Sequence, residues 1–400
     1  MRQRVALAVS GAVLVFALLL ACPVPGAAAG LAITDMAGRQ VSFPGRPGRL
    51  VALGPGALRL VVYLGAQEQV VGVEQIEKDA REGRPYALAH PRLAELPTVS
   101  PGGPAGINKK PDLEGILRVR PEVVFVTYME AGVAEEVQRL LRVPVVVLSY
   151  GRFGTFDEAV FASLRIAGRI LGREERAEQV IAYVETGRHD LRQRVAGVPA
   201  ATRPTVYVGG IGFRGTHGIE STDAEYVPFA WLEARNVVGD RAKEGHLFLD
   251  RETLLRLDPE VVFVDGGGLS HVGADYGRRP EYYRLLRAFR ERKVFTLYPF
   301  NWYMTNVDTA LADAYAVGRI LYPERFRDID LQRRVNEIFR VLAGAPVYNE
   351  MERAYGSLGA RPAFLDLAVL GRLRPRYRTQ RSSHDHGRTK AESPTHPLVS

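Results

Sequence analysis

DLEGILRVRPEVVFV, residues 112–126, and DRETLLRLDPEVVFV, residues 250–264, are two copies of one pattern in this chain. They align without a gap and share Leu-Arg-x-x-Pro-Glu-Val-Val-Phe-Val. In each copy a short helix should end before the proline, because the residue preceding proline is biased out of the helical region. The apolar, β-branched run that follows is typical of a buried parallel strand. The repeat therefore predicts two lobes of similar α/β design.

Between the two copies lies a connecting helical segment, residues 155–197. Apolar residues recur there at helical spacing until Gly172, which should end a first helix. From Glu174 a second apolar stripe runs to Val195. A helix of roughly 20 residues is about 30 Å long, enough to cross a small lobe. We expect this second helix to join the lobes.

Length and charge narrow the classes of protein. The chain has 400 residues, of which 46% are apolar, and this suits two domains with full cores. Of the net charge of +8, residues 360–400 carry +5 and Arg2 and Arg4 carry +2, which leaves +1 for residues 30–359. The predicted folded part is close to neutral, so we expect no nucleic-acid binding.

The N-terminus, residues 1–29, is predicted to be an export signal. Two arginines precede an apolar run that is shorter than the ~20 residues of a spanning helix. Small residues before Gly30 fit ordinary signal cleavage, whereas Leu-Leu-Ala-Cys22 resembles the site of a lipoprotein. Cys22 is the only cysteine, so no disulfide is expected. We expect a periplasmic or otherwise extracytoplasmic protein, either soluble or lipid-anchored through Cys22.

The remaining boundaries follow from changes in pattern. The N-terminal lobe is predicted over residues 31–152, beginning with a small hairpin, and its polar stretch 83–110 is predicted to be loop. The C-terminal lobe is predicted over residues 203–345, with a helix from Asp308 to Leu321 capped by Asn306. Residues 357–400 are predicted to form a basic, disordered tail.

No strong catalytic motif occurs, so an enzyme is not predicted. Gly210-x-Gly212-x-x-Gly215 formally matches a dinucleotide fingerprint, but no helical pattern opens within it, which leaves a nucleotide-dependent oxidoreductase as a remote alternative. His217, His246 and His271 fall in predicted loops and could be ligands of a metal or haem, or ordinary loop histidines.

Aromatic residues gather at the predicted carboxyl ends of the strands, where ligands of open α/β sheets bind. The candidate ligand-binding residues are Tyr128, Phe213, Arg214, Trp231, Trp302 and Tyr303. The alternative for each aromatic ring is core packing. Two facing lobes would line a cleft with aromatic faces and a guanidinium, which suits a large, partly apolar and partly anionic small molecule.

The signal, the hairpin, the paired lobes, the connecting helix and the repeated Pro-Glu-Val-Val-Phe-Val segments together resemble the solute-binding proteins of iron-chelate and cobalamin ABC importers. The resemblance covers roughly residues 31–345. It implies an α/β fold of two three-layer lobes with parallel sheets, bridged by a single long rigid helix. It also implies that one acidic residue on each lobe docks onto arginines of the membrane permease. The matching positions are Glu114 and Glu252, for which helix capping is the alternative role.

The ligand implied by the resemblance is a small-molecule metal chelate, delivered by a monomer to an ABC permease dimer in the inner membrane, with no cofactor of its own. A ferric siderophore is the first expectation, and a corrinoid (cobalamin) or haem is the alternative. A bare metal-ion carrier is more remote, because the predicted cleft holds mostly aromatic residues rather than histidines and carboxylates. A cell-wall or partner-binding module on the same lobes is a further alternative.

Overall fold

The computed structural model describes residues 30–367 except 80, 153–155, 214 and 240–244. The predicted signal segment with Cys22, the candidate Arg214 and most of the predicted tail lie outside the described residues. None of the described helices combines the length and apolar character needed to cross a membrane.

The first lobe is built on a five-stranded parallel sheet of order β5-β4-β3-β6-β7. Its strands are β3 (Leu50–Leu53), β4 (Val70–Glu74), β5 (Thr98–Ser100), β6 (Val123–Thr127) and β7 (Val145–Leu148). The predicted hairpin is present as β1 (Leu31–Thr34) and β2 (Gln40–Phe43). The helices are α1 (Ala57–Tyr63), α2 (Gln75–Asp79), α3 (Pro85–Ala89), α4 (Leu113–Arg118) and α5 (Ala131–Leu141).

Alternate residues of the strands enter separate cores on the two faces of this sheet. Leu50 and Phe125 join the core that contains α1, whereas Val51 and Val124 join the core that contains α4 and α5. A strand that is buried on both faces must be apolar at every position, which explains the unbroken Val-Val-Phe-Val runs. The lobe therefore has three layers, as predicted.

The second lobe contains a four-stranded sheet of order β10-β8-β12-β13, all parallel. Its strands are β8 (Thr205–Gly209), β10 (Arg235–Asn236), β12 (Val261–Asp265) and β13 (Val294–Leu297), and a separate antiparallel pair joins β9 (Ser221–Asp223) to β11 (His246–Phe248). The helices are α8 (Val227–Trp231), α9 (Arg251–Leu257), α10 (Leu269–Arg278), α11 (Pro280–Leu285), α12 (Arg287–Arg290), α13 (Val307–Leu321), α14 (Leu331–Ala343), α15 (Tyr348–Tyr355) and α16 (Phe364–Leu367). Here too the strands divide their side chains between two cores, so the lobe has three layers.

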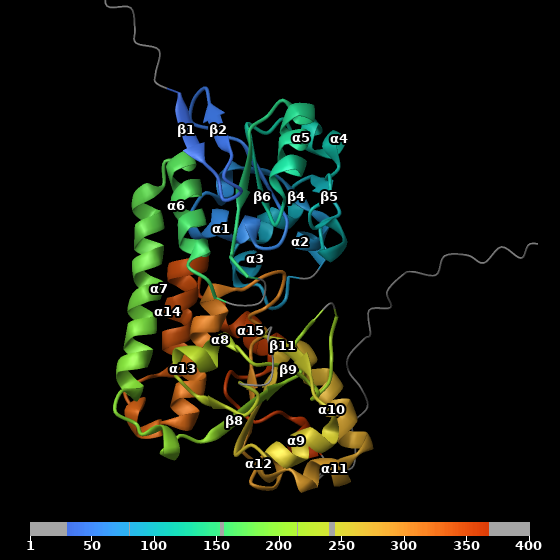
Figure 1. Ribbon diagram of the computed structural model, residues 1–400, viewed down its shortest axis with the longest axis vertical. Helices are drawn as coiled ribbons and strands as arrows, with labels where there is room; N and C mark the ends of the chain where they lie inside the picture. Colours follow the sequence, from blue (N-terminus) through green and yellow to red (C-terminus); the bar gives the residue numbers. More distant parts are fainter. Residues whose placement is uncertain (1–29, 80, 153–155, 214, 240–244, 368–400) are drawn as a thin grey trace, which may run out of the picture.

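The connecting segment forms α6 (Ala159–Leu171) and α7 (Glu174–Val195), and α7 runs alongside both lobes (Figure 1). Gly172 adopts a left-handed conformation, φ 66°, and ends α6 as predicted. The Arg176 Nε donates to the Tyr63 carbonyl in the first lobe at 2.9 Å, and Arg194 forms a bidentate pair with Asp328 in the second lobe at 2.7 and 2.8 Å. The single long helix that joins two parallel-sheet lobes confirms the predicted fold class.

The repeat is equally clear in the structure. In both copies a short helix, α4 or α9, leads into a central strand of its sheet, β6 or β12. The residue before each repeated proline, Arg120 or Asp258, has a positive φ, 48° or 35°. The chain therefore makes the same sharp exit from the helix in both lobes.

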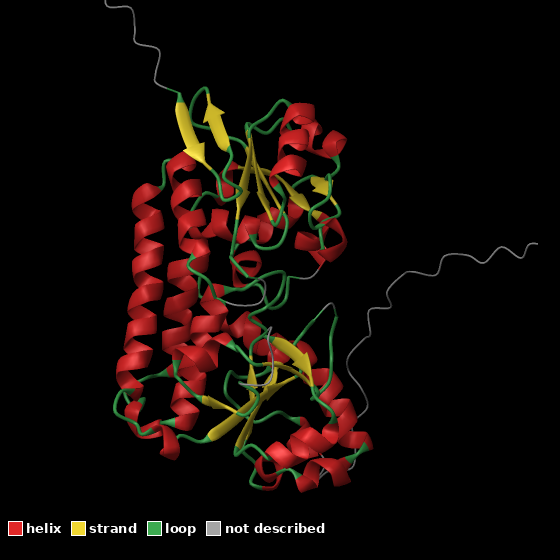
Figure 2. Cartoon of the chain, in the orientation of Figure 1, coloured by secondary structure: helices red, strands yellow, loops and turns green. Residues whose placement is uncertain are grey.

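Two regions differ from the sequence-based expectation. Residues 83–110 are not only loop, because they contain α3 and the edge strand β5, whose three residues are too few to show a period. Helix α14 packs against α1 and α3 of the first lobe, and α15 follows it (Figures 1 and 2). The chain thus returns to the first lobe after building the second.

Candidate functional site

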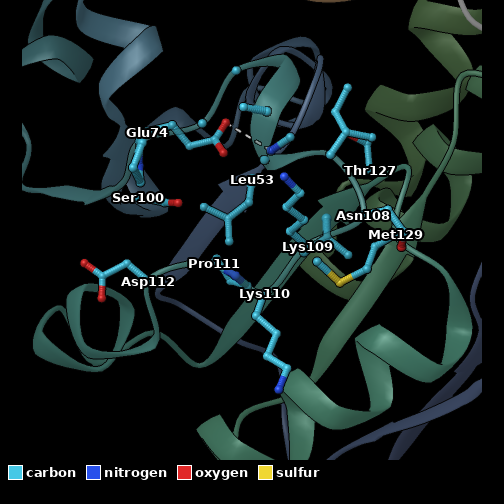
Figure 3. A pocket seen from close by; sticks show the side chains of 18 of the residues that line it. Leu53, Glu74, Ser100, Asn108, Lys109, Lys110, Pro111, Asp112, Thr127 and Met129 are labelled. Atoms are coloured by element: carbon cyan, nitrogen blue, oxygen red, sulfur yellow. Dashed lines mark hydrogen bonds between the residues drawn. The ribbon is translucent and has the colours of Figure 1, made fainter. Parts of the chain in front are cut away.

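A cavity of about 250 Å³ lies at the carboxyl ends of β3, β4, β5 and β6 in the first lobe; we call it the interlobe cavity. Tyr303, from the loop that follows β13, lines it from the second lobe. Figure 3 shows its interior. Its lining includes the side chains of Leu53, Glu74, Ser100, Asn108, Lys109, Lys110, Thr127, Met129 and Tyr303.

Glu74 is the buried acid of this cavity. Its Oε2 accepts hydrogen bonds from the Gly54 N–H at 3.0 Å and from the Tyr303 hydroxyl at 2.7 Å. Burial raises the pKa of Glu74 to about 7, although the Tyr303 hydrogen bond opposes the rise. The carboxyl can therefore gain or lose a proton near neutral pH.

Two adjacent lysines line the cavity and differ in their partners. The Lys110 amino group lies 2.5 Å from Glu136 Oε1. Lys109 is exposed and has no ion pair with any described residue, and Figure 3 shows it extending into the cavity. Ser100 and Asn108 add a hydroxyl and an amide beside it. The Asn108 Oδ1 accepts from the Glu130 N–H at 2.9 Å, which leaves the amide NH₂ as a donor.

The loop 299–306 that carries Tyr303 is held by the first lobe. The guanidinium of Arg59, fully buried in α1, donates to the carbonyls of Thr305, Trp302 and Tyr303 at 2.9, 3.1 and 3.1 Å. It also lies 5.1 Å from the centre of a tyrosine ring, that of Tyr86. These buried, charge-assisted hydrogen bonds therefore join the two lobes next to Tyr303, which lines the cavity.

Tyr303 is itself fixed in an unusual backbone conformation. Tyr303 and Met304 have φ of 51° and 77°, and Tyr128, opposite them in the first lobe, has φ of 54°. The Tyr128 hydroxyl contacts the Met304 sulfur at 2.9 Å across the lobes. Non-glycine residues with positive φ are strained and gather at ligand sites. The strained residues of the two lobes therefore contact each other beside the interlobe cavity, as expected near a ligand site.

The predicted N-cap of α13 has a different role. Asn306 occupies the cap position, but its side chain does not cap the helix. Its Nδ2 donates instead to the carbonyls of Phe300 and Trp302 at 2.9 and 3.2 Å. The amide folds the aromatic loop back on itself, and this helps to present Tyr303.

Trp302 and Phe213 are among the few exposed large apolar side chains, at 39% and 38% exposure. Phe213 stacks on His246 with ring centres 4.2 Å apart. Burial lowers the pKa of His246 to about 4, with a smaller contribution from His217, so this imidazole is neutral at pH 7. Among the described residues no group of three or more potential metal ligands comes together.

Trp231 lies apart from the cavity. It is only 6% exposed, its ring meets the Phe156 ring edge-on at 5.2 Å, and the Arg188 guanidinium of α7 lies 5.8 Å from it. These contacts give Trp231 a packing role against the connecting helix. Its assignment as a ligand-binding residue stays a prediction, as do those of Tyr128, Phe213, Arg214, Trp302 and Tyr303.

Glu114 and Glu252 occupy equivalent first turns, in α4 and α9. The capping role falls on other residues: Asp112 Oδ1 accepts from the Gly115 N–H at 3.0 Å, and Asp250 Oδ1 accepts from the Thr253 N–H at 2.7 Å. Both glutamates are exposed and form no hydrogen bond or ion pair with a described residue. They are therefore available to a partner.

Comparison with known proteins decides the family. A model of the family described as periplasmic binding protein matches residues 50–299, more than half of the chain. The chain belongs to this family.

Relatives of this binding protein share its length. The molybdate-binding protein MolA of Haemophilus influenzae is 25% identical over 331 residues, 77% of this chain and 89% of MolA. An uncharacterised ABC transporter substrate-binding lipoprotein of Bacillus subtilis, YvrC, is 19% identical over 74% of this chain and 87% of its own.

Solved structures share its fold. MolA bound to molybdate superposes with a TM-score of 0.64 at 22% identity, over 79% of this chain and 98% of MolA. A periplasmic solute-binding protein of Veillonella parvula gives a TM-score of 0.65 at 17% identity, over 82% and 96% of the two chains.

These matches confirm the predicted family and make this binding protein the substrate-binding component of an ABC importer. A small-molecule ligand and a membrane permease are its partners. The relatives are transport proteins rather than enzymes.

Sequence reasoning found the loop that carries Tyr303 but missed most of the polar lining. It did not single out Glu74, Ser100, Asn108 or Lys109. Glu74 could have been found, because it directly ends the apolar run Val-Val-Gly-Val and so lies at the carboxyl end of a strand. Lys109 falls in a stretch without hydrophobic periodicity, so the sequence does not predict which way its side chain points.

Proposed function

We propose that this binding protein captures a small metal-containing oxyanion in the interlobe cavity and delivers it to its permease. The observation that carries the proposal is the cavity of about 250 Å³, lined by Lys109 and by Tyr303. This volume is below the roughly 300–1,000 Å³ of pockets that enclose drug-sized molecules. MolA, which is named for molybdate, is a relative of this chain.

The lining holds two carboxyl groups, those of Glu74 and Asp112, and Asp112 already accepts a hydrogen bond from the Gly115 N–H. The lining suits an oxyanion once Glu74 is protonated. Lys109 supplies a positive charge, and Ser100 and Asn108 supply neutral donors, which together replace part of an anion's hydration. An ionised Glu74 would repel the ligand, whereas a neutral one can donate to it. Because the pKa of Glu74 is already about 7, the remaining proton uptake costs little near neutral pH.

A metal chelate is the second candidate, and the partly exposed rings of Trp302 and Phe213 favour it. Aromatic faces stack on the ligand groups of a ferric siderophore, a corrinoid or haem. Such a ligand is larger than the interlobe cavity and would rest partly outside it. A ferric siderophore, the ligand first expected from the sequence, is therefore ranked second because it is too large for the cavity.

For delivery, we propose that Glu114 and Glu252 dock onto basic residues of the permease. Their equivalent places in the repeat and their freedom from capping support the assignment. Exposed charge pairs of this kind set orientation and association rate more than affinity. A monomer outside the cytoplasm, either soluble or anchored through Cys22, fits this role.

The ligand can be identified by thermal unfolding of the exported protein with molybdate, tungstate, sulfate, a ferric siderophore, cobalamin or haem. A ligand at a hundred times its dissociation constant stabilises the native state by about 2.7 kcal/mol, which raises the midpoint by several degrees. We expect molybdate or tungstate to give the shift. A shift with a chelate alone would replace the oxyanion by the second candidate, and no shift with any of them would refute both.

A further inference from the structure

The second lobe carries a surface rich in basic residues that its role in ligand capture does not use. The segment from the end of α10 through α11 and α12 holds seven basic residues; we call them the basic face: Arg278, Arg279, Arg284, Arg287, Arg290, Arg292 and Lys293. All are exposed except Arg287, which is half-buried. Leu285, in their midst, is 60% exposed.

Acidic neighbours only partly neutralise the basic face. Glu281 and Glu291 belong to the same segment, while Asp275, Glu260 and Asp366 pair with it from neighbouring elements. Counting these five acids against the seven basic residues leaves a net charge of +2. A surface in which most charges are paired and a positive excess remains attracts anionic partners.

The equivalent part of the first lobe has the opposite charge. The connection from β6 to β7, residues 128–144, carries three acidic and two basic residues, a net charge of −1. The connection from β12 to β13, residues 266–293, carries three acidic and seven basic residues, a net charge of +4. A fold repeated twice does not require this asymmetry.

The basic face adjoins the proposed docking residue of its lobe. Arg251, beside Glu252, forms an ion pair with Asp275 of α10 at 3.2 Å. The Tyr282 hydroxyl of α11 donates to the Arg251 carbonyl at 3.3 Å. The helices α9, α10, α11 and α12 lie together at the end of the second lobe (Figure 1). Docking through Glu252 would bring this end toward the membrane that holds the permease.

We propose that the basic face binds anionic phospholipid headgroups beside the permease, with Leu285 reaching the apolar edge of the lipid surface. The inference rests on the proposed docking through Glu252. Basic residues near an anionic bilayer are attracted by its surface potential, and the attraction weakens within a Debye length as salt is added. An acidic permease loop is the alternative partner, and vesicle binding measured beside uptake distinguishes the two.

The test measures how the exported protein partitions to phosphatidylcholine vesicles with and without phosphatidylglycerol. The variant combines Arg278→Gln, Arg284→Gln and Arg290→Gln. The matched control combines Arg139→Gln, Arg169→Gln and Arg192→Gln, which removes the same charge from exposed positions elsewhere. Each basic residue lost at the surface should weaken binding about fivefold, so the variant should bind phosphatidylglycerol vesicles about 100-fold more weakly, and the control should not.

Several outcomes would overturn the proposal. Wild-type protein without a preference for phosphatidylglycerol would mean that anionic headgroups are not bound. Equal losses in the variant and the control would mean that net charge and not this face is responsible. A variant that keeps vesicle binding but loses uptake would assign the face to the permease. Ligand-induced stabilisation, measured on the same proteins, reports separately on the proposed function, and uptake by Glu252→Arg reports separately on docking.

Discussion

β6 ends at Thr127 and is followed by Tyr128 and Met129, whereas the equivalent strand β12 ends at Asp265 and is followed by three glycines. In the first lobe, Thr127 and Met129 line the interlobe cavity, and Tyr128 reaches the other lobe. Both are inner strands of a parallel sheet, and a ligand site is expected at the carboxyl ends of such strands. The residues at the end of β6 therefore contribute to the cavity, together with the ends of β3, β4 and β5 and with Tyr303.

In the second lobe the glycines that follow β12 are closely packed. A Cβ at Gly268 would lie 2.4 Å from the Gly210 Cα, and one at Gly266 would lie 2.8 Å from the Tyr355 ring. Asp265 turns back to accept a hydrogen bond from the Gly267 N–H at 2.8 Å. Here glycine allows close packing rather than ligand approach. The repeat thus specifies two similar frames that differ at the ends of the repeated strands, where side chains contribute to a cavity in the first lobe and glycines pack closely in the second.

The largest expected effect tests whether the lobes are equivalent at the permease. Glu114→Arg combined with Glu252→Arg should reduce uptake to background while ligand affinity stays unchanged, because each reversal places like charges against the permease. Each single reversal should cause a partial loss. Uptake of the bound ligand into cells measures it. The control is Glu135→Arg with Glu324→Arg, which changes the same charge at exposed positions. Normal uptake by the double variant would refute the docking assignment.

The second effect concerns two buried acids, Glu74 and Asp265, each at the carboxyl end of a strand in its own lobe. Burial raises both pKa values to about 7. Between the pKa of the unfolded chain and that of the folded protein, the folded protein holds a proton that the unfolded chain has released. For Glu74 this range runs from about pH 4.5 to pH 7, and the free energy of unfolding should fall as pH rises through it. Glu74→Gln should remove about 3 kcal/mol of that dependence. Urea unfolding across the pH range measures it.

The same two acids should differ in ligand binding. Oxyanion affinity should rise as pH falls through 7, because the neutral Glu74 no longer repels the ligand. Glu74→Gln should abolish this pH dependence, whereas Asp265→Asn should preserve it, since Asp265 does not line the cavity. Titration calorimetry at several pH values measures it. An equal response in both variants would place the ligand outside the interlobe cavity.

A third effect concerns the packed strand end. Gly268→Ala should destabilise the protein by about 2 kcal/mol, because the added methyl group meets the Gly210 backbone. Glu130→Ala, at the aligned and exposed position of the first lobe, should change stability by less than about 0.5 kcal/mol. Denaturant midpoints compare the two. Similar losses would mean that the two strand ends are packed alike.

The smallest effect distinguishes two neighbouring lysines. Lys109→Gln should weaken oxyanion binding about tenfold, or by about 1.4 kcal/mol, because the cavity loses its unpaired charge. Lys110→Gln should change affinity less than about twofold, since Lys110 pairs with Glu136. Affinities of the two variants at one salt concentration test this. If Lys110 proved the more important, the ligand would sit nearer to α5.

The sequence predicted the frame better than the cavity. Periodic features such as the Val-Val-Phe-Val strands, the α7 stripe and Gly172 depend on local patterns, and these were correctly located. The cavity depends on side chains from segments far apart in the chain, and Glu74 and Tyr303 are 229 positions apart. No periodicity links such residues. Tyr303 was selected because it is aromatic and follows a strand, whereas Lys109 had neither signal.

Arg59 has a consequence for how the protein moves. Separating the lobes would pull its guanidinium from three carbonyls and leave buried polar groups without partners, which costs several kcal/mol. Thermal motion seldom supplies so much, so empty and loaded molecules should have nearly the same radius of gyration in small-angle X-ray scattering. Release of the ligand would then require the docked transporter to separate the two lobes. The hydrogen bonds of Arg59 would set much of the free energy that this separation costs.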